Sequence, residues 1–251
     1  AKQALKIKPD FAEAYLNMGS AQHQKDDFLA AIDSYKNALK IKPDYADAYN
    51  NMGNAQRDMG DLETAIKSYT QSLKYRPNYA EAYNNMGIAL KDNANLDQAI
   101  TSYMQALKIK PKYAEAYSNM GIALKEKGNL KAAIESYSQA LKINPKYAKA
   151  FHNMGISQKA KGDLDAALYS YKQALNIEPN YAEVYSKMGN IQRDMGNLST
   201  AIESYKQALK IKPNYAEAFY NLGIAFKDKG DLDEAINSFK QTLEINPDYA
   251  E

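Results

Sequence analysis

The sequence predicts an all-α solenoid built from seven helix-turn-helix repeats of 34 residues. The first observation behind this prediction is a ladder of prolines with a constant spacing of 34 residues: Pro9, Pro43, Pro77, Pro111, Pro145, Pro179, Pro213 and Pro247. The second is an aromatic residue two positions after each proline: Phe11, Tyr45, Tyr79, Tyr113, Tyr147, Tyr181, Tyr215 and Tyr249. A fixed period of this length is the sequence signature of stacked repeats, so the periodicity determines the fold class.

Small residues recur at two positions of every repeat, when each repeat is numbered from the alanine after that aromatic residue. Position 8 is always glycine: Gly19, Gly53, Gly87, Gly121, Gly155, Gly189 and Gly223. Position 20 is always alanine: Ala31, Ala65, Ala99, Ala133, Ala167, Ala201 and Ala235. Residues this small allow two helix backbones to approach closely, so we expect a tight helix-helix contact at both positions.

Large residues also fall into columns. Position 4 is aromatic in every repeat: Tyr15, Tyr49, Tyr83, Tyr117, Phe151, Tyr185 and Phe219. Position 24 is aromatic as well, from Tyr35 to Phe239. Such repetition favours packing over chemistry for these rings, because a catalytic phenol would occur once. Positions 3, 4, 7, 8 and 10, and then 20, 21, 24, 27 and 28, have the spacing of two amphipathic helices. Each repeat is therefore predicted to contain a first and a second helix.

The helix boundaries have their own signals. Position 16 is Asp or Asn, the residue types that cap helix N-termini: Asp27, Asp61, Asn95, Asn129, Asp163, Asn197 and Asp231. Position 15, which precedes it, is glycine in five repeats and should end the first helix in the left-handed conformation. Asp26 and Ala94 replace that glycine, so we expect those two turns to be more strained. The proline at position 32 closes the second helix.

These columns together closely resemble the tetratricopeptide repeat family, whose pattern has aromatic residues at positions 4 and 24, small residues at 8 and 20, and proline at 32. The resemblance covers the whole chain. It implies a right-handed α-solenoid whose first helices line a concave groove. Position 11, usually large and apolar in the family, departs from the pattern in four repeats: Gln22, Gln56, Gln158 and Gln192. The type of residue at position 11 repeats with a period of four repeats, which suggests that the array grew by duplication of a four-repeat block.

We interpret residues 1–251 as one array. Residues 1–11 should be the end of a preceding second helix and its linker, and residues 250–251 the start of a further repeat. The seven repeats between them span residues 12–45, 46–79, 80–113, 114–147, 148–181, 182–215 and 216–249.

The candidate binding residues lie at position 6 of the first helix. The family resemblance places positions 2, 5, 6, 9, 12 and 13 on the concave surface. Position 6 forms an amide ladder interrupted once by lysine: Asn17, Asn51, Asn85, Asn119, Asn153, Lys187 and Asn221. An amide offers both a donor and an acceptor, as needed to bind a peptide main chain. The ladder also resembles the superhelix of O-linked N-acetylglucosamine transferases. Asparagine is, however, common at position 6 throughout the family.

Composition excludes several function classes. The chain has no cysteine and two histidines, His23 and His152, so no cofactor or metal site is expected. We interpret both histidines as solvated surface residues. A net charge of +2 gives no support for nucleic acid or membrane as a partner. The basic column at position 12 is mostly followed by an acidic residue at position 13, which favours a solvated surface over an acidic ligand. Because no nucleophile is unique to one repeat, we expect no catalytic residue. The mixed charges and the lack of cysteine favour a cytoplasmic location.

Three functions remain open. The first is an interaction scaffold that binds an extended peptide segment of another protein. The second is a substrate-recruiting arm of a larger enzyme such as a glycosyltransferase. The third is a scaffold that stacks end to end on copies of itself, because Ile236, Phe239 and Leu243 should be partly uncovered at one end, and Ala4, Leu5 and Ile7 form half a helix at the other.

Overall fold

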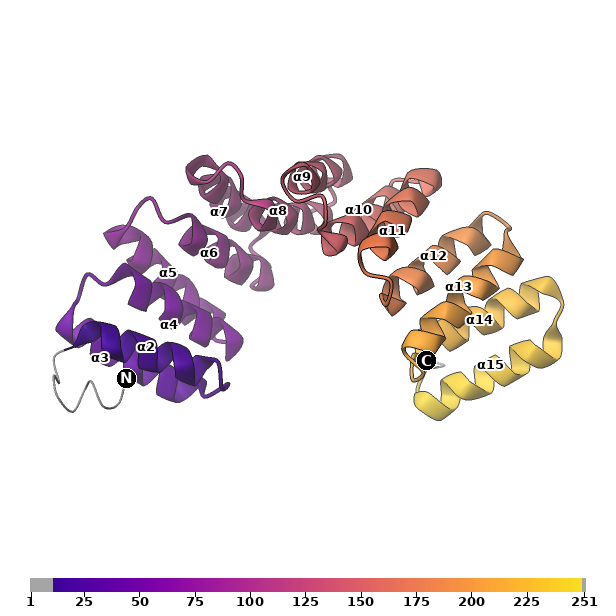
Figure 1. The fold of residues 1–251 in the computed structure, drawn as a ribbon, viewed down its shortest axis with the longest axis horizontal. Coiled ribbons are helices and arrows are strands. Elements are labelled where there is room, and N and C mark those ends of the chain that lie inside the picture. Colours follow the sequence, from indigo (N-terminus) through magenta and orange to yellow (C-terminus); the bar gives the residue numbers. More distant parts are fainter. Residues whose placement is uncertain (1–10, 250–251) are drawn as a thin grey trace. The chain divides into compact units, whose positions relative to one another are not determined.

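The computed structural model describes residues 11–249, which form fourteen helices and no strand (Figure 1). The first and second helices of repeats one to seven are, in order, α2 (Ala12–His23) and α3 (Phe28–Ile41), α4 (Ala46–Asp58) and α5 (Leu62–Tyr75), α6 (Ala80–Asp92) and α7 (Leu96–Ile109), α8 (Ala114–Glu126) and α9 (Leu130–Ile143), α10 (Ala148–Ala160) and α11 (Leu164–Ile177), α12 (Ala182–Asp194) and α13 (Leu198–Ile211), and α14 (Ala216–Lys229) and α15 (Leu232–Ile245). The all-α solenoid prediction is confirmed. The predictions for residues 1–10 and 250–251 lie outside the described residues.

The chain divides into two compact bodies, an N-terminal body that ends at Ser136 and a C-terminal body that begins at Tyr137. In the N-terminal body each second helix contacts its own first helix and the first helix of the next repeat: α3 lies between α2 and α4, α5 between α4 and α6, and α7 between α6 and α8. In the C-terminal body α11 and α13 make the same two contacts. Contacts between neighbouring repeats are those of a solenoid.

The close approach predicted at position 8 is present in both bodies. A Cβ atom added to Gly53 would lie 2.7 Å from Cε1 of Tyr69, and one added to Gly189 would lie 2.7 Å from Cε1 of Tyr205. Separations this short do not occur between real side-chain carbons. Both tyrosine rings are fully buried. The position 24 ring therefore packs against helix backbone that only glycine leaves accessible.

The turn between the two helices of a repeat mostly follows the predicted chemistry. Glycine at position 15 has positive φ, as at Gly60, and Asp26 and Ala94 are held in the same left-handed region with φ of 58° and 59°. That region is costly for residues with a Cβ, as expected for these two turns. The predicted N-caps are only partly confirmed. Four of them accept a bond from the helix backbone, whereas Asn95, Asn197 and Asp231 accept none.

The glutamines at position 11 have a structural explanation that the sequence pattern did not reveal. In repeats two, five and six the serine at position 23 donates a 2.6 Å hydrogen bond to the glutamine Oε1, as Ser68 does to Gln56. In repeat one the Gln22 amide nitrogen donates to the Ser34 hydroxyl at 2.6 Å. Where position 11 is apolar, the serine turns back onto its own helix, as Ser102 does by donating to the carbonyl of Gln98. The glutamines therefore join the two helices of their repeats.

This pairing predicts an asymmetry between two substitutions in repeat two. Ser68→Ala leaves the buried Gln56 amide without its donor, and should lower the free energy of unfolding by about 1–3 kcal/mol. Gln56→Leu should cost less, because Ser68 can then bond to its own helix as Ser102 does. Urea denaturation of both variants measures the difference. Equal losses, or a larger loss for Gln56→Leu, would contradict this account.

The tyrosine columns make the fold sensitive to high pH. Burial raises the pKa of Tyr69, Tyr171 and Tyr205 above the ordinary value of 10.0, and burial with the nearby Glu217 raises the pKa of Tyr215 to about 12. Above about pH 10 the unfolded chain releases these phenolic protons while the folded chain still holds them. The free energy of unfolding should therefore be unaffected by these groups below about pH 10 and should fall as the pH rises above it. Tyrosinate absorbance should rise together with loss of helical circular dichroism. Ionisation of these phenols near pH 10 with the helices intact would show that burial does not protect them.

Candidate peptide-binding surface of the first helices

Several first helices of successive repeats contact one another within a body, and the outward sides of the first helices in each body form the surface that we call the first-helix face. These contacts link α2 to α4, α4 to α6 and α6 to α8 in the N-terminal body, and α12 to α14 in the C-terminal body. Figure 1 shows α4, α6 and α8 following one another in the N-terminal body. Every predicted ladder residue lies on one of the first helices.

The ladder residues are all accessible from outside. Asn17 is exposed and the other six are half-buried: Asn51, Asn85, Asn119, Asn153, Lys187 and Asn221. An amide that is half-buried keeps some surface for a ligand while its position is fixed by its neighbours. The structure thus places the whole predicted set at the surface, and the two bodies each carry part of it.

Hydrogen bonds between repeats hold part of the ladder. Asn85 Nδ2 donates to Oδ1 of Asn50 at 3.1 Å, and Asn119 Nδ2 donates to Oδ1 of Asn84 at 3.0 Å. Each bond joins position 6 of one repeat to position 5 of the repeat before it. Asn51 takes part through its oxygen, which accepts a 3.2 Å bond from Asn50 Nδ2. The ladder is therefore a structural link as well as a surface feature.

The family resemblance placed position 5 on the concave surface, and this was wrong for repeats two and three. Asn50 and Asn84 are buried, at 5% and 1% exposure, so they act as internal partners of the ladder. The consecutive asparagines Asn50-Asn51 and Asn84-Asn85 were a signal in the sequence that position 5 could belong to the same amide network as position 6. Their pairing with the next repeat could not be read from one repeat alone.

Lys187 does not offer an unpaired cation to a ligand. Its Nζ lies 2.9 Å from Glu217 Oε1, at position 2 of the next repeat. A lysine in the ladder could attract an acidic ligand group, but the neighbouring repeat already balances the charge of Lys187. Lys187 joins repeats six and seven much as the amide bonds join earlier ones.

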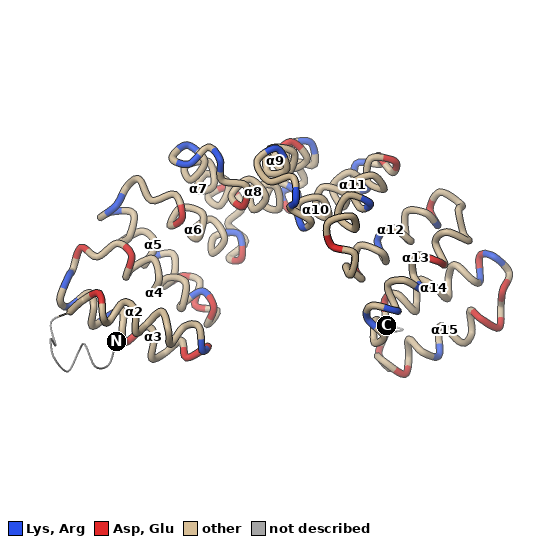
Figure 2. Tube along the Cα trace, in the orientation of Figure 1, with Lys and Arg blue, Asp and Glu red and all other residues tan. Residues whose placement is uncertain are grey.

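The charges at positions 12 and 13 pair with each other. His23 lies 2.9 Å from Asp58 and Lys159 lies 2.9 Å from Asp194, so both contacts connect adjacent repeats. Figure 2 shows basic and acidic segments interspersed in both bodies. The interpretation that these columns form a solvated, charge-balanced surface agrees with this pairing.

Ion pairs also lie between position 2 and position 31 of the same repeat. Arg76 binds both carboxylate oxygens of Asp47, at 2.8 and 2.7 Å, and Lys110 Nζ lies 2.8 Å from Glu81 Oε1. The hydrogen bond from Lys110 holds the pKa of Glu81 below its ordinary value. These acidic side chains at one end of the first helices are therefore ionised and engaged within their repeat.

His152 was predicted to be a solvated surface residue, and this was wrong. It is only 5% exposed, and its Nδ1 lies 2.9 Å from the hydroxyl of Tyr181. Its ring packs edge-on against the same tyrosine, with centroids 5.1 Å apart. His152 occupies position 5, the column that is buried in Asn50 and Asn84. Among residues 11–249 no cluster of histidine, aspartate and glutamate could hold a metal ion.

The repeats match a known family over most of the chain. The family model described as TPR repeat matches residues 23–60, 53–93, 95–128, 121–162, 159–196 and 189–230, and the model described as tetratricopeptide repeat matches residues 216–249. The chain belongs to the tetratricopeptide repeat family. Repeats of this family are generally non-catalytic scaffolds that bind protein or peptide partners.

Solved structures agree with this assignment. MamA is 29% identical with a TM-score of 0.62, over 66% of this chain and 96% of its own. YrrB, described as a TPR protein with an unusual peptide-binding site, is 23% identical with a TM-score of 0.61, over 74% of this chain and 95% of its own. A tetratricopeptide repeat protein from Parabacteroides merdae ATCC 43184 is 19% identical with a TM-score of 0.71, over 95% and 94%. A comparison with curated proteins gave no match.

These matches support the family and leave two narrower predictions untested. None of them specifically supports a relationship to the superhelix of O-linked N-acetylglucosamine transferases, which stays a hypothesis. The cytoplasmic location also stays a prediction. No tetratricopeptide helix within residues 11–249 is both long and apolar enough to cross a membrane.

Proposed function

We propose that this tetratricopeptide array is an interaction scaffold that binds an extended peptide segment through the amide ladder of the first-helix face. The observation that carries the proposal is the way the internal bonds use the ladder amides. Asn85 and Asn119 each donate one N–H to an asparagine of the preceding repeat. An amide has a second N–H and a carbonyl oxygen with two lone pairs, so one donor and one acceptor remain for a ligand.

The internal bonds also determine how these amides are oriented. In both bonds the nitrogen of the ladder amide faces the preceding repeat, because it donates to the oxygen of Asn50 or Asn84. An amide held in this way loses little freedom when a ligand arrives, which favours binding. A peptide main chain presents the complementary acceptor and donor, so recognition would tolerate many sequences. The peptide-binding site in the description of YrrB supports the same kind of ligand for this fold.

The charge pairs of the face support a ligand without a strong net charge. His23, Arg57, Lys91 and Lys159 at position 12 each lie within 3 Å of a carboxylate. A highly charged ligand would have to separate these pairs and would gain little from them. Main-chain recognition by neutral amides is therefore favoured over recognition of acidic or basic side chains.

The ladder predicts a specific loss of binding. A peptide is first selected on the native chain from a displayed random library, and its affinity is then measured for Asn51→Ala, Asn85→Ala and Asn119→Ala combined, all of which lie in the N-terminal body. If each amide contributes on the order of 1 kcal/mol, affinity should fall by about two orders of magnitude. N-methylation of the peptide main chain at alternate residues should cause a similar loss, because it removes the N–H groups that the amides would bind.

A matched control separates binding from stability. The combination of Asn50→Ala and Asn84→Ala removes the internal acceptors but keeps the ladder amides. It should lower stability, and it should lower affinity by much less than the ladder variant does, because only the fixed orientation of the amides is lost. Unchanged affinity in a folded ladder variant, or full binding of the N-methylated peptide, would show that the ladder serves only to join the repeats.

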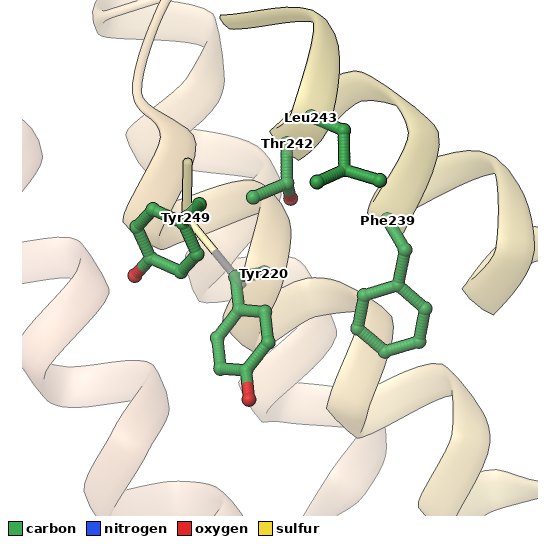
Figure 3. Close-up of a pocket in the computed structure, with 5 residues that line it drawn as sticks. All are labelled: Tyr220, Phe239, Thr242, Leu243 and Tyr249. Atoms are coloured by element: carbon green, nitrogen blue, oxygen red, sulfur yellow. The ribbon is translucent and has the colours of Figure 1, made fainter. Parts of the chain in front are cut away.

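A second candidate function is end-to-end association, and it rests on the outer side of α15. Ile236 and Leu243 are 53% and 45% exposed, and Phe239 is half-buried, as predicted. A pocket of about 200 Å³ lies there, lined by Tyr220, Phe239, Thr242, Leu243 and Tyr249. Figure 3 shows their side chains around it. The second end named in the prediction, Ala4, Leu5 and Ile7, lies outside the described residues.

The repeats themselves indicate what would cover α15. In repeat six, Ile202 and Tyr205 on α13 are covered by Leu222 and Ala225 of the following first helix. The helix α2 carries the equivalent residues Met18 and Ala21, and Ala21 is exposed whereas its counterpart Ala55 is fully buried. The occupant that fits α15 is therefore α2 of a second copy, in a head-to-tail contact that extends the solenoid.

Head-to-tail association predicts a mass that rises with concentration. Sedimentation should show growing assemblies of the native chain, and Ile236→Asp with Leu243→Asp should remove them by placing charges in the apolar contact. Met104→Asp is the control, because Met104 is 58% exposed on α7, which packs against α6 and α8 and not against α2 or α15. A constant monomer mass, or equal effects of both variants, would rule out this contact.

A further inference from the structure

Two pockets with the same construction lie in the two bodies, and they share no residue with the amide ladder. Each has a volume of about 500 Å³. The pocket of repeat three is lined by Pro77, Asn78, Tyr83, Gln105, Lys108 and Ile109. The pocket of repeat six is lined by Pro179, Asn180, Tyr185, Gln207, Lys210 and Ile211. Every residue of the second set follows its equivalent by three repeats, so these two pockets are copies of one site.

Each pocket combines an apolar surface with an unpaired cation. In repeat three the tyrosine comes from α6, the lysine and isoleucine from the last turn of α7, and the proline and asparagine from the preceding linker. Lys108 and Lys210 are exposed and form no ion pair within residues 11–249, in contrast to the paired cations of the first-helix face. Tyr83 and Tyr185 are half-buried, so each ring keeps an accessible part.

Repeat two shows how the chain itself fills the equivalent space. Position 30, which is isoleucine in repeats three and six, is there Tyr75. The Tyr75 ring stacks on Tyr49 at position 4, with centroids 5.7 Å apart and planes 19° apart. Lys74 at position 29 lies over the Tyr75 ring, 5.9 Å from its centroid. An aromatic ring thus lies beside the tyrosine and under the lysine of this repeat.

We infer that the pockets of repeats three and six each bind an aromatic ring that carries a nearby carboxylate, as in the C-terminal aromatic residue of a peptide or a free aromatic acid. With isoleucine at position 30, the side chain that would stack on Tyr83 or Tyr185 is missing, and a ligand ring takes its place. Offset stacking and the lysine above the ring both favour an aromatic group. The carboxylate balances Lys108 or Lys210, and the amides of Asn78 or Asn180 offer donors.

The test uses the full chain and the probe acetyl-glycyl-glycyl-phenylalanine with a free carboxylate. Nuclear magnetic resonance of isoleucine methyl groups should show Ile109 and Ile211 shifting in parallel, with a dissociation constant on the order of 1 mM. The C-terminal amide of the probe should bind about fivefold more weakly, as for an exposed ion pair. The leucine analogue should not bind. Binding of N-acetylphenylalanine alone would identify a free acid as sufficient, and binding of the peptide alone would identify a peptide terminus.

Variants that fill the pockets provide the decisive control. Ile109→Tyr and Ile211→Tyr copy the arrangement of repeat two, so the fold accommodates them. Each should remove one site, and together they should abolish saturation transfer to the probe. Ile177→Tyr introduces the same side chain in repeat five, where position 29 is Asn176, and should keep both sites. No shift at millimolar probe, equal binding of the leucine analogue, or retained binding in the doubly filled variant would overturn the inference. Because no ladder residue is involved, failure here leaves the proposed function untouched.

Discussion

The contact on which the rest of the structure depends is the one between the glycine at position 8 and the aromatic ring at position 24. It sets the distance between the two helices of a repeat, and the next first helix then packs on the ring. The ring determines this contact and the hydroxyl does not, because Phe239 approaches Gly223 as closely as the tyrosines approach their glycines, at 2.6 Å for an added Cβ. A stack of similar repeats can keep one geometry only if this distance recurs in each.

The hydroxyl groups on those rings are free to differ between repeats. Tyr69 and Tyr205 donate to Asn54 and Asn190, which occupy position 9 of their repeats. In repeat three position 9 is Ile88, and the buried hydroxyl of Tyr103 has no hydrogen-bond partner among the described residues. A buried polar group without a hydrogen-bond partner lowers the stability of the fold. The repeats therefore share their packing but differ in how many of their buried polar groups are hydrogen-bonded.

The fold could be predicted from the sequence because its signals are local and repeated. Prolines, glycines and aromatic columns each constrain one turn or one helix, and seven copies leave little ambiguity. Polar partnerships were harder to predict, because Gln56 and Ser68, or Asn85 and Asn50, meet across helices through side-chain rotamers. The serine that occupies position 23 in every repeat was a readable signal for the first pairing. His152 was misplaced because position 5 was expected on the concave surface, whereas the structure buries this position in Asn50, Asn84 and His152.

The spacing of one ladder amide per repeat has a consequence for which lengths of ligand the surface would select. A surface that presents the same group at every repeat offers several equivalent binding positions, so a short peptide could bind at any of them and move from one to the next. A longer segment would occupy fewer positions and span more groups. Such a surface distinguishes ligands by length, in steps of one repeat. In the C-terminal body Lys187 replaces the amide and pairs with Glu217, so the series of identical groups is interrupted there.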